Sequence, residues 1–321
     1  MESAIAIDIG GTKVAAGIVT AGGRLLRRAA VPTAAASLFD DVCELVERVR
    51  GGDEVVCGVG CGGPMTRGGE RVSPLNIPAW RDFPLRDRIA AATGLATFVD
   101  NDAKALALAE GWVGAAAGSP AFIGMVVSTG VGGGIVLDGR LLDGAGGNAG
   151  HIGHLIVEPG GRQCACGARG CLEAEVSGTA IAAITGRPAA EAGAAVRERA
   201  GRLVGRAVAS VANLLDLRLA VVAGSVALGF GAPFFESAQA ELDASARLAF
   251  SRGARIVPAG LGDAAPLVGA AAVGFRGLAA PAGGSIVGCP GGPLDGGLHR
   301  FPDGGLDGSP GGPSRRGTDG R

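Results

Sequence analysis

Apolar runs that end at glycines open both halves of the chain. Residues 4–10, AIAIDIG, form a short apolar run before glycines, which predicts a buried strand followed by a turn. Residues 14–20 and 24–31 predict two further strands, joined by a hairpin turn at residues 21–23. Residues 121–142 repeat this plan as strand, glycine turn and strand. The pattern therefore predicts a strand-turn-strand unit at the start of each half.

Helical spacing of apolar residues alternates with further strands along the rest of the chain. The expected helices span residues 39–50, 84–93, 101 onward, 191–216, 233–250 and 264–278. Strands that run into glycine turns are expected within residues 54–63 and 218–227, and plain strands at residues 96–100 and 254–259. Strand-turn units that alternate with helices indicate an α/β fold in two lobes.

Composition narrows the class of protein. The 321 residues are 47% apolar, enough for one large or two ordinary domains with a sizeable core. A net charge of −1, 4% aromatic residues and no tyrosine argue against a nucleic-acid or membrane-surface partner. The start of the chain lacks a basic segment, and no apolar window approaches the length of a membrane span. Seven scattered cysteines fit a reducing compartment, so we expect a cytoplasmic enzyme.

The end of the chain differs from the rest. Residues 280–321 are rich in glycine and proline and show no periodicity, which predicts a disordered tail. Cys289 and His299 fall in this segment. We therefore expect neither residue to take part in function.

Two glycine-rich turns occupy the same place in the two halves. They are DIGGTK at residues 8–13 and STGVGGGI at residues 128–135. Glycines let a backbone approach a phosphate closely and point amide N–H groups at it. Neither turn is a Walker A loop, which needs Gly-Lys-Ser/Thr at the start of a helix. Two plain hairpins are the alternative, but their symmetric placement favours phosphate binding.

With these turns, the sequence resembles the ROK family of bacterial sugar kinases and sugar-responsive repressors, within the actin-like ATPase superfamily. The resemblance covers residues 4 to about 278. It is carried by DIGGTK, DNDAKALALAE (100–110), STGVGGGI, GHIGH (150–154) and CACGARGCLE (164–173). The cysteine spacing in the last motif is the most specific of these signals.

The resemblance implies a two-lobed actin-like (ribonuclease H-like) α/β fold with ATP and a hexose in the cleft between the lobes. Residues 1–118 would form the N-terminal lobe, completed by the helix at residues 264–279. Residues 119–263 would form the C-terminal lobe with a zinc-binding loop. Family members are often dimers or tetramers, so a homo-oligomer is expected.

The resemblance also assigns the nucleotide site. Asp8 would help to place Mg²⁺, and Gly224 would lie near the nucleotide. At this last loop the chain departs from the family, which usually has Gly-Gly where this chain has Gly224-Ser225. The remaining residues expected to contact ATP are Gly10, Gly11, Thr12 and Lys13 from the first turn and Thr129, Gly130 and Gly132 from the second.

Asp102 is the expected catalytic base, and Asn101 matches a sugar-binding asparagine of the family. Phosphoryl transfer to a hydroxyl requires mostly positioning and charge stabilisation, with a carboxylate to accept the hydroxyl proton. A helix N-terminus favours an ionised carboxylate, so Asp102 is expected to be charged at neutral pH. The alternatives are that Asp102 is only a helix N-cap, and that Asp100 is the base.

Zinc and the sugar share one segment in this interpretation. His154, Cys164, Cys166 and Cys171 match the family's zinc ligands, and one imidazole with three thiolates is a closed, structural set. Free buried cysteines are the alternative. Asn76, His151, His154 and Glu173 are expected to contact the sugar, with His154 using its second ring nitrogen. By contrast, Trp80 and the cysteines Cys43, Cys57 and Cys61 are expected only to pack.

His151 leaves the substrate open. Most family kinases have glutamate here, which accepts two hydrogen bonds, whereas a neutral imidazole offers one donor and one acceptor. We therefore expect a glucokinase first, with N-acetylmannosamine, N-acetylglucosamine or another hexose as alternatives. A repressor is less favoured, because the chain begins at the first strand without a helix-turn-helix segment. A sugar sensor without catalysis is the third alternative.

Overall fold

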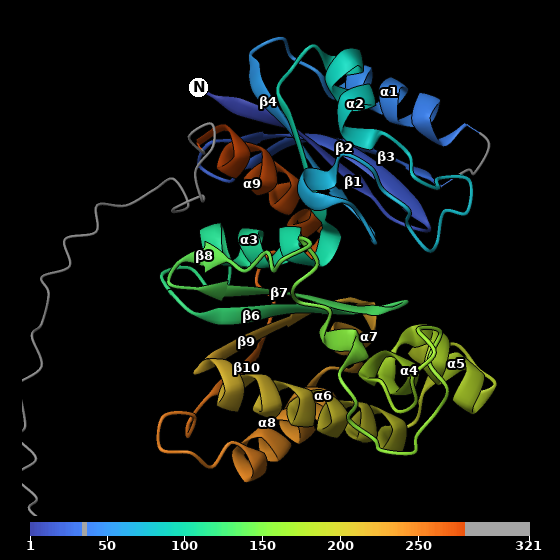
Figure 1. Ribbon diagram of the computed structural model, residues 1–321, viewed down its shortest axis with the longest axis vertical. Helices are drawn as coiled ribbons and strands as arrows, with labels where there is room; N and C mark the ends of the chain where they lie inside the picture. Colours follow the sequence, from blue (N-terminus) through green and yellow to red (C-terminus); the bar gives the residue numbers. More distant parts are fainter. Residues whose placement is uncertain (34–36, 280–321) are drawn as a thin grey trace, which may run out of the picture. The chain divides into compact units, whose positions relative to one another are not determined.

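Ten strands and nine α-helices form the part of the chain that is described, residues 1–33 and 37–279 of a computed structural model. The strands are arranged in two five-stranded sheets, one from each half of the chain (Figure 1). The expected disordered tail at residues 280–321, with Cys289 and His299, lies outside the described residues.

The first sheet has the strand order β3-β2-β1-β4-β5. Its strands are β1 (Ser3–Ile9), β2 (Lys13–Thr20), β3 (Leu25–Pro32), β4 (Glu54–Cys61) and β5 (Thr97–Asn101). The period of two along β1 assigns its faces. Ile5, Ile7 and Ile9 join the core under α1 (Leu38–Val49) and α2 (Leu85–Thr93), whereas Ala4 and Ala6 face α9 (Ala265–Ala279). Small residues on that face let the helix lie close to the sheet.

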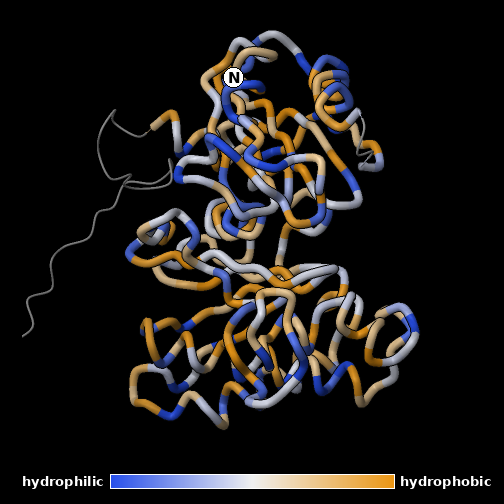
Figure 2. Tube along the Cα trace, turned by 45° about the vertical axis from the view of Figure 1, so that its right-hand side comes forward, coloured by the Kyte–Doolittle hydropathy of each residue, from blue (hydrophilic) through white to orange (hydrophobic). Residues whose placement is uncertain are grey.

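The second sheet has the order β10-β9-β6-β7-β8. Its strands are β6 (Phe122–Val127), β7 (Val131–Leu137), β8 (Arg140–Leu141), β9 (Leu219–Ala223) and β10 (Arg255–Pro258). One face shares a core with α6 (Ala194–Leu215) and α8 (Ala232–Ser245), and the other packs against α3 (Asp102–Val113). In Figure 2, apolar orange positions run along the strands of both sheets.

Helices α3 and α9 pack against each other between the two sheets, as Figure 1 shows. α9 contacts β1 and β4 of the first sheet, and α3 contacts β6 and β7 of the second. This arrangement agrees with a C-terminal helix that completes the N-terminal lobe, although the division at residues 118 and 263 stays a prediction. The carboxyl ends of β1, β4, β5 and β6 border the site described below.

Most expected elements are present, and the exceptions have local causes. The helix expected at 191–216 begins at Ala194, after a 3₁₀ turn at Ala189–Glu191. The helix expected at 233–250 ends at Ser245, and Leu248 and Phe250 beyond it are exposed. The helical spacing of apolar residues continues beyond Ser245, so the sequence pattern predicted too long a helix.

Three short helices and one short strand were not predicted. They are α4 (Leu172–Val176), α5 (Gly178–Thr185), α7 (Ser225–Phe230) and β8. The three helices are shorter than the window of about 11 residues in which apolar spacing identifies a helix, and β8 has only two residues. Among the helices of the described residues, none combines the length and apolar character needed to cross a membrane.

Candidate active site

The first glycine turn joins β1 to β2 and is closed by its own backbone. The amide of Gly10 donates to the carbonyl of Lys13 at 3.0 Å, and the hydroxyl of Thr33 donates to the carbonyl of Gly10 at 2.8 Å. Gly11, Thr12 and Lys13 are exposed. A side chain at Gly11 has no room, because its Cβ would lie 2.6 Å from Cβ of Asn76. An expected phosphate residue and an expected sugar residue are therefore neighbours.

Asn76 lies between β4 and α2, in a segment whose backbone is stabilised by the side chain of Arg81. The guanidinium of Arg81 donates to the carbonyl oxygens of Pro74, Ile77 and Trp80 at 2.9, 3.2 and 3.0 Å. Trp80 is 4% exposed and stacks on Phe83 with ring centroids 4.3 Å apart. The expectation that Trp80 packs is confirmed. Sequence analysis missed Arg81, whose only signal was a cation between an aromatic and an acidic residue.

Asp8 and Asp102 both lie close to Gly60 on β4. A Cβ at Gly60 would lie 3.7 Å from Oδ1 of Asp8 and 3.8 Å from Cα of Asp102. Burial raises the pKa of Asp8 to about 7, with the negative charge of Asp102 adding to the rise and Lys13 opposing it. Two carboxylates this close in a poorly hydrated place repel each other, so a cation between them is favoured.

Asp102 opens α3, but it does not cap the helix. The cap is Asn101, whose side-chain oxygen accepts from the amides of Ala103 and Lys104. Asp102 is an exposed residue, although the protein around its carboxyl group partly desolvates it. Burial raises its pKa above the usual range, against the lowering effects of the Ala103 amide and His151. The helix N-terminus acts in the opposite direction, and a charged Asp102 at neutral pH stays a prediction.

Asp100, the alternative base, is occupied by other partners. Its Oδ1 lies 3.0 Å from Nζ of Lys104 and accepts from the amide of Asn101, and its Oδ2 lies 3.6 Å from Arg276. The Asp100 side chain is 14% exposed. Burial raises the pKa of Asp100, although Lys104 and Arg276 act to lower it. Both of its oxygens are engaged by these cations, which favours Asp102 over Asp100 as the group that contacts the hydroxyl.

His151 and Glu173 face Asp102 from the second half of the chain. Burial lowers the pKa of His151, the neighbouring His154 lowers it further, and Glu173 and Asp102 act to raise it. His151 is thus neutral at pH 7 and offers one donor and one acceptor. Glu173 accepts from the amide of Val131 at 2.8 Å, and its Oε2 would lie 2.8 Å from a Cβ at Gly130. One glutamate therefore borders both the histidine and the second glycine turn.

The second glycine turn joins β6 to β7. The hydroxyls of Ser128 and Ser225 lie 2.9 Å apart, and the hydroxyl of Thr179 donates to the carbonyl of Thr129 at 3.0 Å. Gly224 has φ 100°, and a Cβ there would overlap the backbone of Val127. The unusual Gly224-Ser225 pair therefore keeps the glycine that the backbone requires and adds a hydroxyl bridge to the turn.

Gly132 lies one step inside β7, where it packs against α3. A Cβ at this position would be 2.8 Å from Cβ of Ala103. The close packing of β7 on α3 therefore explains why this position is a glycine.

His154, Cys164, Cys166 and Cys171 come together as one cluster. Their ligand atoms all lie within 4.8 Å of one another. Nδ1 of His154 is 3.7 Å from Sγ of Cys164, and Sγ of Cys166 is 3.7 Å from Sγ of Cys171. Tetrahedral Zn²⁺ with bonds of about 2.3 Å to sulfur requires sulfur atoms about 3.8 Å apart. The donor set therefore fits zinc, and Nε2 of His154 is left for another partner.

Two of the clustered thiols have pKa values shifted in opposite directions in the metal-free protein. Burial and the neighbouring sulfurs raise the pKa of Cys171 to about 12. The amide of Ala168 hydrogen-bonds to the sulfur of Cys166 and lowers its pKa. A divalent cation would hold all three sulfurs as thiolates at neutral pH. Cys57 and Cys61 are buried and Cys43 is partly buried in the first half, which confirms that they pack.

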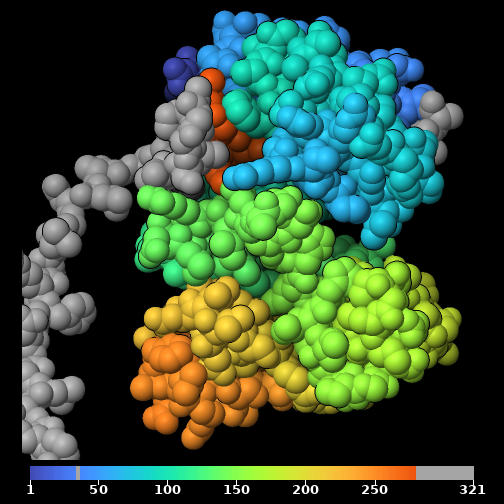
Figure 3. All heavy atoms as spheres, in the orientation of Figure 1, coloured from blue at the N-terminus to red at the C-terminus, as the bar shows by residue number. Residues whose placement is uncertain are grey.

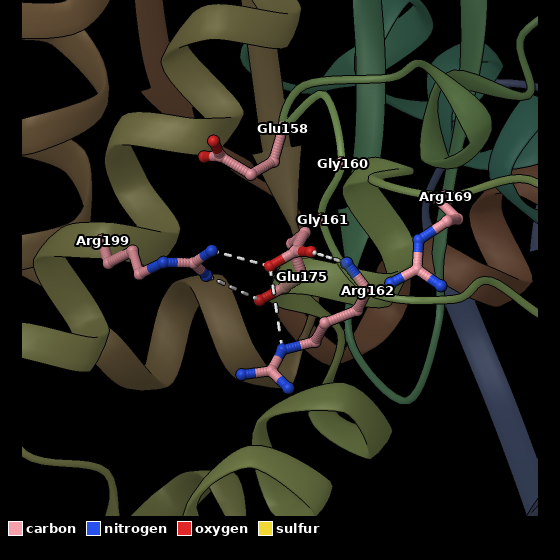
Figure 4. A pocket seen from close by; sticks show the side chains of 7 residues that line it. All are labelled: Glu158, Gly160, Gly161, Arg162, Arg169, Glu175 and Arg199. Atoms are coloured by element: carbon pink, nitrogen blue, oxygen red, sulfur yellow. Dashed lines mark hydrogen bonds and ion pairs between the residues drawn. The ribbon is translucent and has the colours of Figure 1, made fainter.

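The chain just after the three cysteines is joined to α6 by an ion pair. Glu175 is 2% exposed and accepts from the amide of Arg162 at 2.7 Å and from the guanidinium of Arg199 at 2.6 Å. Figure 4 shows these groups around a shallow cavity of about 320 Å³. Glu175 follows Glu173 by two residues, so its ion pair anchors the start of α4. Sequence analysis missed this anchor.

The surface is hollowed between the cyan β4–α2 segment and the yellow-green segment around α4 and α5, as Figure 3 shows. The first carries Asn76, and the second carries Glu173 and the cysteines. Two of the residues expected to bind sugar, Asn76 and Glu173, thus lie on segments that border one hollow.

Known proteins of similar sequence identify the family of the chain. The sequence model of the ROK family matches residues 4–275. A glucokinase of Thermotoga maritima is 40% identical over 184 residues, which are 55% of this chain and 58% of that protein. An N-acetylmannosamine kinase of Yersinia pseudotuberculosis is 36% identical over 253 residues, 72% of this chain and 86% of that protein. The chain belongs to the ROK family.

Solved structures show the same relationship. A ROK family glucokinase of Streptomyces griseus, in complex with glucose and AMPPNP, has a TM-score of 0.75 at 31% identity; the match covers 85% of this chain and 99% of that one. A ROK hexokinase of Thermus thermophilus has a TM-score of 0.72 at 34% identity, over 86% of this chain and 99% of that one. The two sheets are therefore those of the actin-like ATPase fold, as expected.

Proposed function

We propose that the protein is an ATP-dependent sugar kinase that transfers the γ-phosphoryl group of ATP to a hydroxyl of a hexose. The observation that carries the proposal is the position of Asp102, which lies beside Asp8 and faces His151. Glycine turns from both halves border the same place, as a triphosphate would require. The sugar-kinase names of the relatives support the same activity.

In the proposed reaction, the carboxylate of Asp102 accepts the proton of the attacking hydroxyl. The hydroxyl oxygen forms a bond to the γ-phosphorus as the bond to the β-phosphate oxygen breaks, and ADP leaves with that electron pair. The raised pKa of Asp102 brings the base closer to the operating pH, which favours proton transfer. Asp8 would hold Mg²⁺, which neutralises charge on the phosphates when it is bound.

A structural zinc ion is part of the proposal. His154, Cys164, Cys166 and Cys171 would hold it, with no position open for water. It would order the segment between His151 and Glu173, both of which border the sugar site. Lacking such a cross-link, a segment with so many glycines would lose considerable conformational entropy on ordering.

Glucose is the substrate that we propose first, giving glucose 6-phosphate. N-acetylmannosamine, N-acetylglucosamine and other hexoses are alternatives, because the neutral His151 pairs with a different pattern of hydroxyls than a glutamate does. The relatives include enzymes named for both glucose and N-acetylmannosamine.

A coupled assay of ADP release with Mg-ATP tests the proposal. Glucose, mannose, fructose, allose, N-acetylglucosamine and N-acetylmannosamine should each be supplied alone. We expect one of them to be phosphorylated with a kcat/KM at least about tenfold above the others, the discrimination that one hydrogen bond commonly gives. Sugar binding without ADP release would instead establish a sensor, and no binding would reject the sugar site.

A further inference from the structure

Four charged side chains, three of them largely buried, form a closed ring next to the proposed base. Nζ of Lys104 lies 3.0 Å from Oδ1 of Asp100 and 2.8 Å from Oδ1 of Asp143. Arg276 lies 3.1 Å from Oδ2 of Asp143 and 3.6 Å from Oδ2 of Asp100. Each cation therefore contacts both carboxylates. The ring joins the end of β5, the first turn of α3, the last turns of α9 and the segment that follows β8.

Lys104 is the most deeply buried member. Its side chain is 3% exposed, compared with 13% for Arg276 and 42% for Asp143. Its ammonium group also donates to the carbonyl oxygen of Gly147 at 3.2 Å, so its three protons have three acceptors. Although burial opposes it, hydrogen bonds from Lys104 and Arg276 lower the pKa of Asp143. A buried ammonium group whose hydrogen bonds are all made restricts the movement of the groups that accept them.

The segment that Lys104 binds has little structure of its own. Residues 143–150 read DGAGGNAG, and the three glycines Gly144, Gly147 and Gly150 have positive φ. Within the segment, the amide of Ala149 donates to the carbonyl of Asp143 at 3.0 Å, and a longer bond of 3.4 Å joins Gly147 to Gly144. Such a glycine-rich stretch has a large entropy cost of ordering. It leads directly into His151.

We propose that Lys104 is a positioning residue that holds the His151 segment in place relative to Asp102. Lys104 and Asp102 both lie in the first turn of α3, two residues apart. Lys104 binds the start of the glycine segment at Asp143 and its middle at Gly147. The same helical turn thus presents the base and fixes the loop that ends at the sugar-facing imidazole. This inference rests on the proposed kinase function for its kinetic test, and it has a second test that needs no activity.

The kinetic test uses Lys104→Met, which keeps most of the unbranched side chain and removes the ammonium group. We expect the KM for the sugar to rise at least about tenfold, as for loss of a buried charged hydrogen bond, with the KM for ATP within about twofold of wild type. A role limited to overall stability would leave both KM values of the folded enzyme unchanged. Leu203→Ala, a cavity in the distant α6 core, is the matched control for lost stability.

The double variant Lys104→Met/Asp143→Asn restores charge balance in the ring. If the two residues act through one contact, the sugar KM of the double variant should be within about twofold of Lys104→Met alone. Effects that multiply would show that the residues act independently, which contradicts the inference. The double variant also provides a neutral ring if the single variant folds poorly.

Hydrogen–deuterium exchange gives the readout that is independent of catalysis. In Lys104→Met, amides of residues 144–151 should exchange at least about tenfold faster, while those of β9 stay as in wild type. Unchanged exchange in residues 144–151 would overturn the inference, even if a sugar is phosphorylated. If the wild-type protein phosphorylates no sugar, the proposed function fails, and this exchange measurement still decides the role of Lys104.

Discussion

At the scale of single residues, the site combines groups that are unfavourable by themselves. Burial raises the pKa of both Asp8 and Asp102, and the negative charge of Asp102 raises that of Asp8 further. Their raised pKa values are a cost to the fold that a binding site for a cation and a hydroxyl explains. Two substitutions separate these contributions.

Asp102→Asn should abolish phosphoryl transfer and preserve sugar binding. The amide has nearly the same shape as the carboxylate but cannot accept the hydroxyl proton, so kcat should fall by about 10²-fold or more. Steady-state kinetics and titration calorimetry with the preferred sugar measure the two effects. Turnover near the wild-type rate would show that another group is the base.

Asp8→Asn should stabilise the metal-free protein, and the gain should depend on pH. Because the pKa of Asp8 is raised from 3.8 to about 7 in the folded state, the folded protein binds more protons than the unfolded chain between these values. The Asp8 contribution to the free energy of unfolding is therefore lost as pH rises from about 4 to 7. Urea denaturation should show the variant gaining up to about 4 kcal/mol at pH 8 and little at pH 4. An equal gain at both values would contradict this account.

At the scale of elements, irregular segments between strands and helices hold many of the candidate site residues in place. The segment between β8 and α4 carries His151, His154 and the three clustered cysteines, and Glu173 follows it in the first turn of α4. It has two outer anchors, Lys104 at its start and the Arg199–Glu175 pair at its end. A metal ion bound by the cluster in the middle of the segment would stabilise this glycine-rich stretch further.

Cys166→Ser should remove zinc and loosen this segment. We expect one zinc per chain in the wild type by metal analysis and none in the variant. We also expect a loss of about 2 kcal/mol or more in the free energy of unfolding. Cys43→Ser is the control, since Cys43 lies on α1 in the first half of the chain and should keep the metal. Absence of zinc from carefully prepared wild-type protein would reject the site.

At the scale of the whole molecule, close helix–sheet packing joins the first sheet to the last described helix. A Cβ at Gly58 on β4 would overlap the carbonyl oxygen of Ala270 on α9, and Gly274 packs against Gly58 in turn. Glycines on both elements thus let α9 lie against a sheet built more than two hundred residues earlier. α9 also packs on α3, which carries the proposed base.

Gly58→Ala should therefore destabilise the protein by about 3 kcal/mol, since the methyl group meets backbone on the opposite helix. Thermal or urea unfolding measures the loss. Gly229→Ala is the control: no atom lies within 4 Å of the new Cβ in α7, so the change should be neutral or stabilising by up to about 1 kcal/mol. Equal stability of the two variants would show that α9 can shift away from the sheet.

Comparison of expected and observed elements shows which information is local. β1, β4 and α2 were predicted nearly to the residue, because short apolar runs between glycines and a proline at a helix start depend on near neighbours. The cysteine cluster was predicted as well, since its spacing lies within one segment. Short α7, by contrast, and the end of α8 at Ser245 depend on what packs against them.

The order of residues alone predicted the two strand-turn-strand units, the glycine turns and the candidate zinc ligands, because each lies within one short continuous stretch of the chain. Only the tertiary structure decided that Asn101 rather than Asp102 caps α3, and that Asp100 is bound in an ion-pair ring. It also decided that Lys104 reaches Gly147 across the fold. These outcomes depend on burial and on contacts between residues distant in the chain, and neither quantity is present in the pattern of a single segment.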